Sequence, residues 1–222
     1  MGSGQDRVCR IRGARRRLAA DGPPRVRADG DFERVSLPAG DCDVLRDLLL
    51  AERPSTVIEV GLAYGGSALA IAEALVAAGT GDARHLIVDA YQEQFHGSGW
   101  AAITEAGLAD LCCLMAERSQ IALARLLRDG FVADAAFVDG SHIFHNVFVD
   151  LFYLRELVRP GGLVILDDCS YLSVATAVSY FEVNTGWTQE PIARPTRLRA
   201  FRLPEFRTEP GFESFRPFGL EL

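Results

Sequence analysis

The sequence predicts an α/β fold, with a mostly parallel sheet flanked by helices. Short apolar runs alternate with helical patterns along most of the chain, one apolar run leads into a glycine-rich turn and a helix, and acidic residues end several of the runs. Short runs rich in β-branched residues are typical of strands buried on both faces of a parallel sheet. The carboxyl ends of such strands lie along one edge, where α/β proteins bind ligands.

Composition and charge narrow the class of protein. The 222 residues are enough for one α/β domain with a full core, and the formal net charge of −7 gives no electrostatic case for binding nucleic acid. No apolar run is long enough to span a membrane, and the N-terminal region has no signal-peptide core. The five cysteines lack a C-x-x-C spacing, so we expect reduced, mostly buried thiols in a cytoplasmic protein.

Residues 1–30 are expected to form an arm that precedes a single domain of residues 31–222. Six arginines cluster there and are followed by Gly22-Pro23-Pro24. Such a cluster can hold an acidic partner or form a subunit contact, as in a homo-oligomer. The plainer interpretation, which we favour, is a solvated and partly disordered leader. The six residues are Arg7, Arg10, Arg12, Arg15, Arg16 and Arg17.

The stretch T-V-I-E-V-G-L-A-Y-G-G-S at 56–67 is the centre of the prediction. It reads as a buried strand, then a turn containing Gly61 and Gly65, then a helix over 68–75. This layout makes a crevice in which a ligand approaches the backbone and the free N–H groups of a helix start. The spacing is not the G-x-G-x-x-G of dinucleotide sites. Glu59, beside the turn, repels phosphate but suits a ligand with a positive group.

The other predicted elements continue the alternation. Further strands are expected at 85–89, 111–115, 135–139 and 163–168, followed by an antiparallel pair at 187–192 and 197–203. Helices are expected at 41–50, 103–108, 143–158 and 174–183, with another ending at Leu127. The stretch 90–100 is polar, aromatic and glycine-containing, and it fits either a lid over the site or an ordinary loop.

The second strand is expected to end at an acid, Asp89. In nucleotide-binding folds an acid at this place accepts hydrogen bonds from the ribose hydroxyls. The spacing between Glu59 and Asp89 fits one strand–helix–strand unit. Together, the two acids therefore indicate a nucleotide-type ligand more strongly than either one alone.

Three more acids, Asp139, Asp167 and Asp168, follow neighbouring predicted strands. Like charges at close range are unfavourable unless a cation or a proton lies among them. We expect no basic residue beside these three carboxylates, so they suit a hard divalent ion such as Mg²⁺. The alternative is one helix cap and two turn residues.

His142 lies three residues after Asp139, in the turn that leads to the next helix. The chain contains no lysine, so His142 is the best candidate for a general base at neutral pH, with His145 as the second choice. A histidine at such a turn can also be a simple helix cap.

Two parts of the sequence resemble class I S-adenosylmethionine-dependent methyltransferases. The pattern E-V-G-x-x-x-G-G-S resembles motif I of that class, and V-D-G-S-H at 138–142 together with R-P-G-G-L-V-I-L-D-D at 159–168 resembles a metal-dependent branch. That branch includes natural-product O-methyltransferases that act on macrolide and other antibiotic sugars and on cephamycin-type scaffolds. The resemblance covers roughly residues 57–169.

The resemblance carries expectations for the fold, the reaction and the site. It implies a seven-stranded Rossmann-like sheet and methyl transfer from S-adenosylmethionine to a hydroxyl of a small metabolite, with Mg²⁺ or Mn²⁺ as the metal. The implied cofactor-binding residues are Glu59, Gly61, Gly65, Ser67 and Asp89, together with Ser119 and Gln120, which match an adenine-contacting pair of the related catechol branch. The implied metal ligands are Asp139, Asp167 and Asp168, and the implied base is His142, since the lysine base of the catechol branch is absent.

Two other functions fit the same residues. A methyltransferase-like fold can retain the crevice and catalyse a cyclisation or another rearrangement without methyl transfer. The chain can also be a non-catalytic subunit that uses the arginine-rich arm and the Phe- and Arg-rich tail as contacts. The sequence does not name the acceptor substrate.

Overall fold

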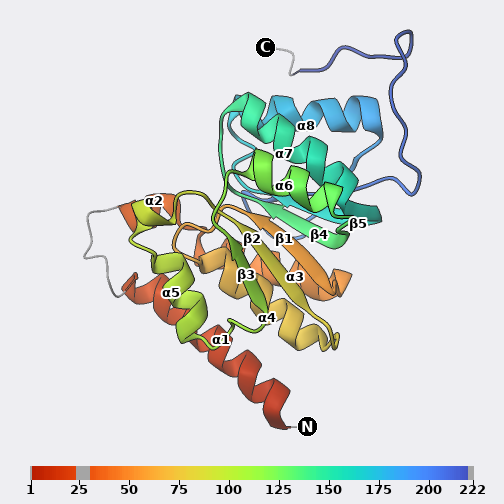
Figure 1. Cartoon of the computed structure of the whole chain (residues 1–222). Coiled ribbons are helices and arrows are strands. Elements are labelled where there is room, and N and C mark those ends of the chain that lie inside the picture. Colours follow the sequence, from red (N-terminus) through yellow and green to blue (C-terminus); the bar gives the residue numbers. More distant parts are fainter. Residues whose placement is uncertain (1, 24–30, 220–222) are drawn as a thin grey trace.

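The computed structural model describes residues 2–23 and 31–219, which form a seven-stranded sheet between two layers of helices (Figure 1). The strand order is β3-β2-β1-β4-β5-β7-β6. The first five strands of this order are parallel, while β7 runs antiparallel to both β5 and β6. The predicted fold is therefore confirmed. The strands are β1 (Thr56–Val60), β2 (Arg84–Val88), β3 (Cys112–Met115), β4 (Ala133–Val138), β5 (Val158–Leu166), β6 (Thr188–Glu190) and β7 (Arg199–Arg202).

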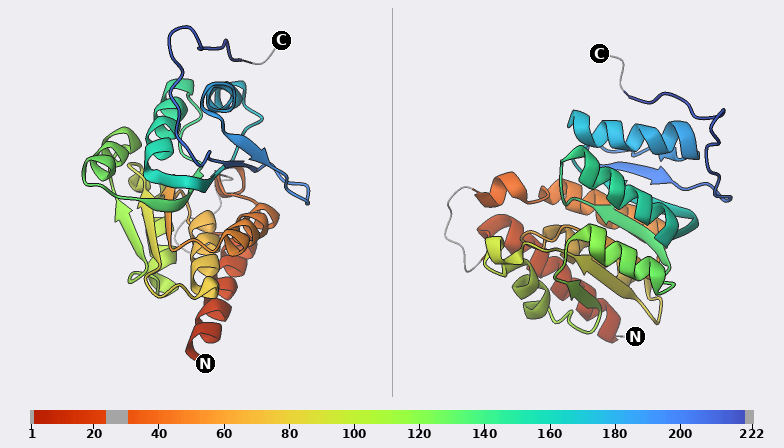
Figure 2. Two further views of the ribbon diagram at one scale, coloured as in Figure 1. Left: turned by 90° about the vertical axis from the view of Figure 1, so that its right-hand side faces the viewer. Right: turned by 45° about the horizontal axis from the view of Figure 1, so that its top comes forward.

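The two faces of the sheet are covered by different helices (Figure 2). Because side chains alternate along a strand, Val57 packs on one layer and Ile58 on the other. The first layer contains α1 (Gly2–Asp21), α3 (Ala39–Glu52), α4 (Gly66–Ala78) and α5 (Ser98–Glu105). The second contains α6 (Ser119–Arg128), α7 (Phe144–Leu157) and α8 (Leu172–Thr185). Two short elements, α2 (Asp31–Val35) and η1 (Gln92–Phe95), complete the list.

The expectation of a solvated, partly disordered leader is wrong for residues 2–21. They form α1, which packs along α4 and buries Ile11 and Leu18 in the core. Arg12 and Arg15 are bound to the fully buried Glu73 of α4, with N–O distances of 2.7 and 3.2 Å. These two arginines therefore neutralise the charge of a carboxylate inside the fold, and this pairing replaces the predicted contact with an acidic partner. The predicted boundary at residue 30 lies outside the described residues.

Several element boundaries differ from those predicted. The helix expected at 103–108 begins earlier, at Ser98, so much of the stretch 90–100 belongs to η1 and α5. The Pro-Gly-Gly segment at 160–162 does not separate α7 from the next strand, because β5 starts at Val158, directly after α7. The short helix α2 gave no clear signal in the sequence. These differences leave the predicted order of strands and helices unchanged.

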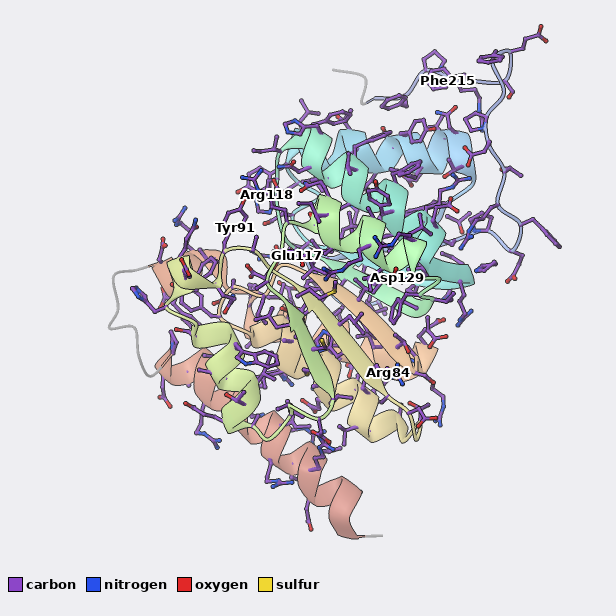
Figure 3. All side chains as sticks on the ribbon, viewed as in Figure 1. Arg84, Tyr91, Glu117, Arg118, Asp129 and Phe215 are labelled. Carbon is purple, nitrogen blue, oxygen red and sulfur yellow. The ribbon has the colours of Figure 1, made fainter. Side chains whose placement is uncertain are left out.

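The C-terminal segment after β7 lies along α7 and α8. Figure 3 shows Phe215 on this segment above α8, and its ring lies 6.4 Å from that of Tyr180. The buried Arg155 of α7 is paired with Glu209 and donates to the carbonyl oxygen of Thr208 at 2.7 Å. Among the described residues, no helix is both long enough and apolar enough to cross a membrane.

Candidate active site

The turn after β1 has the tight geometry that its glycines predict. Gly61 has φ +95°, and a Cβ atom there would lie 2.2 Å from the carbonyl oxygen of Asp139. Gly65 has φ +87°, and a Cβ atom there would lie 3.0 Å from the carbonyl oxygen of Gly99. Only glycine fits such positions without strain. The turn is thus held between the start of α5 and the turn that follows β4.

Asp89 follows β2 and binds this turn through its carboxylate. One oxygen accepts hydrogen bonds from the backbone N–H groups of Leu62 and Ala63 at 2.9 and 3.1 Å, and from the Gln92 amide at 3.0 Å. The other oxygen accepts from the Tyr91 N–H at 2.6 Å. Asp89 lies where a ribose-binding acid is expected, but in this structure its carboxylate links the turn to the segment after β2, which carries Tyr91 (Figure 3).

Glu59 is fully buried beneath the turn. One carboxylate oxygen accepts a hydrogen bond from Ser67 Oγ at 2.5 Å, and the other lies 2.9 Å from His85 Nε2. His85 is also fully buried, and its Nδ1 lies 3.7 Å from Cys112 Sγ. Burial opposes the charged imidazole, but its contacts with Cys112 and Glu59 outweigh this effect and raise the pKa of His85 to about 9. Glu59 and Ser67 therefore join β1 to the first turn of α4.

Ser119 and Gln120 begin α6, at the same edge of the sheet as the turn. The Gln120 amide donates a hydrogen bond to Asn146 Oδ1 of α7 at 3.0 Å. Asn146 Nδ2 donates in turn to Ser141 Oγ at 3.0 Å. Gln120, one of the two residues that the resemblance assigns to the adenine, is thus connected through Asn146 to the turn that carries Asp139 and His142.

The acids after β4 and β5 do meet, and His142 lies among them. His142 Nε2 is 2.9 Å from an Asp168 oxygen and 4.0 Å from an Asp139 oxygen. Asp139, His142 and Asp168 each offer a ligand atom, and these atoms lie within 4.8 Å of one another. Asp168 has φ +56°, an uncommon conformation for a residue other than glycine that is found at functional sites.

Asp167 is placed differently from Asp139 and Asp168. Its buried side chain accepts a hydrogen bond from the Arg197 guanidinium at 2.5 Å, and a second Arg197 nitrogen lies 4.0 Å from Asp168. The expectation that no basic residue lies beside the acids is therefore wrong. Arg197 precedes β7, and the antiparallel pairing of β7 with β5 brings it to the ends of the parallel strands.

The electrostatics of the cluster favour a cation or a proton. Burial raises the pKa of Asp139 well above the usual aspartate range, and the carboxylates of Asp167 and Asp168 raise it further. Burial also raises the pKa of Asp167, although Arg197 opposes the increase. A divalent ion is one partner that would relieve the repulsion among these carboxylates, to which Arg197 already supplies one positive charge.

Sequence reasoning missed three residues of this region. His85 carried a signal, because it is a polar residue at the start of an otherwise apolar run. It lies two positions before Ile87, on the face of the sheet that also carries Glu59. Asn146 lies in α7, where Asp150 and Arg155 are polar or charged residues that are also buried, and no local pattern distinguished Asn146 from the exposed polar residues of the helix. Arg197 had no local signal, since its position depends on the return of the chain through β6 and β7.

A family model described as a methyltransferase domain matches residues 58–169 of the sequence. The match begins in β1 and ends directly after the acids that follow β5, and so includes the glycine turn, Asp89 and the three acids, but not Arg197. The chain belongs to this methyltransferase family. A search of curated proteins found no significant match.

Several solved structures share the fold. The O-methyltransferase TomG from Streptomyces achromogenes, involved in tomaymycin synthesis and solved with SAM, has a TM-score of 0.66 and 19% identity over 89% of each chain. An O-methyltransferase from Bacillus cereus solved with SAH has a TM-score of 0.62 and 15% identity over 87% of this chain and 90% of that one. Cofactor-bound Rv0187 from MTB has a TM-score of 0.64 and 18% identity over 90% of each chain.

Asp89→Ala in this methyltransferase is expected to weaken the binding of S-adenosylmethionine at least tenfold, about 1.4 kcal/mol. The substitution removes the acceptor that holds the N–H groups of Leu62, Ala63 and Tyr91. Isothermal titration calorimetry of the folded variant checks the loss. Asp89→Asn, which keeps one carbonyl acceptor, should lose less affinity. Equal affinity in the wild type and Asp89→Ala would show that this carboxylate does not organise the cofactor site.

Proposed function

We propose that the chain transfers the methyl group of S-adenosylmethionine to a hydroxyl of a small metabolite, with a divalent cation bound beside the acceptor. The observation that supports this best is the contact between the two turns. Gly61 of the cofactor turn lies directly against the backbone of Asp139, at 2.2 Å for an added Cβ. A methyl donor held by the first turn would therefore face the acids of the second.

The cofactor would be held by the turn after β1, by the segment after β2 and by the start of α6. Gly61 and Gly65 let the turn pack closely against the backbone of Asp139 and Gly99, and Asp89 fixes the turn. Ser119 and Gln120 would offer polar groups at the far side. Glu59 and Ser67 would support the turn and not touch the cofactor themselves. The Glu59 carboxylate is buried, and its oxygens are already in contact with Ser67 and His85. The SAM and SAH present in two structural neighbours support this assignment.

The cation, Mg²⁺ or Mn²⁺, would be held by Asp139 and Asp168, whose crowded carboxylates suit a hard ion. When bound, it would lower the pKa of the acceptor hydroxyl and fix its orientation. Asp167 was expected to be a third ligand, and its hydrogen bond to Arg197 leaves it the least available of the three. His142 would take the proton of the acceptor, with Asp168 orienting its ring at 2.9 Å.

The surface around His142 favours an acceptor with an apolar body. Ser173 Oγ donates to the His142 carbonyl oxygen at 2.6 Å, and the His142 and Tyr171 rings are 5.1 Å apart, so the starts of α7 and α8 form one surface. Large exposed apolar groups beside a polar site are typical of ligand contacts. Such a surface suits a role in natural-product biosynthesis, and TomG, which shares the fold, is itself involved in tomaymycin synthesis. The exposed side chains are Ile143, Phe144, Tyr171 and Leu172.

The test of this function is transfer of a labelled methyl group. The purified chain is incubated with S-adenosylmethionine labelled in the methyl group and with extracts of the source cell, and the products are analysed by mass spectrometry. A labelled product heavier than its acceptor by one CH₂ unit supports methyl transfer. A product of unchanged mass would favour a cyclisation or rearrangement. A chain that binds no cofactor and converts nothing would favour a non-catalytic subunit.

Chelation provides a separate prediction for the cation. EDTA should abolish turnover, and Mg²⁺ or Mn²⁺ should restore it, because the repulsion among Asp139, Asp167 and Asp168 is relieved by a divalent ion. Cofactor binding, measured by calorimetry in the same buffers, should largely survive. Full turnover in EDTA would instead assign the acids to a metal-free site in which Arg197 supplies the positive charge.

A further inference from the structure

The first turn of α6 is held by polar side chains of α7. Asn146 and Asp150 lie four residues apart and so share one face of α7. Asn146 Oδ1 accepts the hydrogen bond of Gln120, and Asp150 faces Ser119. The two residues that the proposed function assigns to the adenine side of the cofactor therefore both depend on α7 for their placement.

Asp150 is an unusual residue to find here, because only 1% of its surface is exposed. Burial raises the pKa of Asp150 to about 7, and the hydrogen bond with Ser119 opposes this only in part. Its Oδ1 atom has no hydrogen-bond partner among the described residues. A buried polar group with an unused atom is unfavourable for stability, which suggests that it is retained for what it positions.

Asn146 joins this face of α7 to the turn between β4 and α7, residues 139–143, which carries Asp139 and His142 and is called the catalytic turn below. Its Oδ1 accepts from Gln120 at 3.0 Å, while its Nδ2 donates to Ser141 Oγ at 3.0 Å. The same Ser141 oxygen accepts the N–H of Ile143 at 3.2 Å, so it closes the turn that contains His142. The Asn146 side chain thus connects the start of α6 with the turn that carries His142. Its oxygen accepts from Gln120, on the cofactor side, and its nitrogen donates to Ser141, on the catalytic side.

We propose that Asn146 is a positioning residue that couples cofactor binding to the geometry of the catalytic turn. The inference rests on the proposed function and extends it. Ordering of Gln120 by the cofactor fixes the Asn146 amide, and the amide then fixes Ser141 and the turn on either side of it. If the cofactor stabilises the ordered turn, the ordered turn stabilises the bound cofactor by the same amount, because such coupling is reciprocal. A substitution that loosens the turn at Ser141 should therefore weaken cofactor binding.

The test uses Ser141→Ala, with S-adenosylhomocysteine as the calorimetric probe. Ser141 belongs to a partly exposed turn, so the variant should fold, and circular dichroism checks this. We expect its Kd for S-adenosylhomocysteine to rise about three- to tenfold and its kcat to fall. Ser141→Thr, which keeps the hydroxyl, should restore both. Phe152→Ala, on the exposed side of α7, is the matched control and should change neither.

The decisive comparison repeats Ser141→Ala in an Asn146→Leu background. If Asn146 carries the coupling, Ser141→Ala should no longer change the Kd once the amide has been removed. An unchanged Kd for Ser141→Ala in the wild-type background, or an equal rise in both backgrounds, would overturn the coupling while leaving the methyltransferase assignment intact. Failure of the wild-type chain itself to bind S-adenosylhomocysteine would overturn both proposals.

Discussion

Replacing His142 with alanine is expected to lower kcat by roughly 10²–10⁴, the usual range for loss of a general base. His142 is the only histidine in the cluster of candidate ligand atoms described at this edge of the sheet, and its Nε2 lies 2.9 Å from Asp168. Its side chain is 43% exposed, so a substrate hydroxyl can reach it and the substitution should leave the fold intact. Single-turnover and steady-state rates with an accepted substrate provide the measurement.

His145→Ala is the matched comparison. His145 lies in the first turn of α7 and is exposed, and its side chain makes no hydrogen bond or ion pair with another described residue. Its removal should leave kcat within about twofold of the wild type if His142 is the base. Calorimetry with S-adenosylhomocysteine should give equal affinities for both variants. A near wild-type kcat in His142→Ala would refute the assignment, and a large loss in His145→Ala would transfer the role to that residue.

Replacing His85 with leucine is expected to lower the free energy of unfolding by about 3–5 kcal/mol, the usual cost of removing one partner of a buried ion pair. Glu59 and His85 have no exposed surface, and among the described residues no other basic group lies within 4.0 Å of the Glu59 carboxylate. His85→Leu would therefore leave the Glu59 carboxylate buried with only the Ser67 hydroxyl as a partner. Urea unfolding followed by circular dichroism gives the value.

A double variant and the pH dependence of stability distinguish the effect of an unpaired Glu59 carboxylate from the effect of lost side-chain packing. Glu59→Leu/His85→Leu removes both charges and should be less destabilised than the sum of the single variants. Folding raises the pKa of His85 from 6.5 to about 9, so the stabilisation is complete below about pH 6.5 and is lost as the pH rises through 9. The His85→Leu variant should lack this decline. If the free energy of unfolding changed equally with pH in the wild type and in His85→Leu between pH 6.5 and 9, a charged His85 would be contradicted.

The sequence was sufficient to predict the alternating fold because its strands are short apolar runs with glycine turns and terminal acids. The same periodicity brought Asp139 and Asp168 to one edge, where the structure places them beside His142. It could not predict Arg197, because that contact depends on how β7 returns along β5. It also failed for α1, whose arginines resemble a solvated tail in composition and pair with a glutamate about 60 positions further along the chain.

The pairing of α1 with Glu73 has a practical consequence for work on this enzyme. An investigator who regarded the arginine-rich N-terminus as dispensable would begin a shortened version at Asp31. That version would leave the Glu73 carboxylate in the core with only Arg46, whose nearest nitrogen is 3.8 Å away, for balance. It would also uncover the side of α4 on which Ile11 and Leu18 pack. Affinity tags and fusion partners are therefore better attached ahead of the first helix than in place of it.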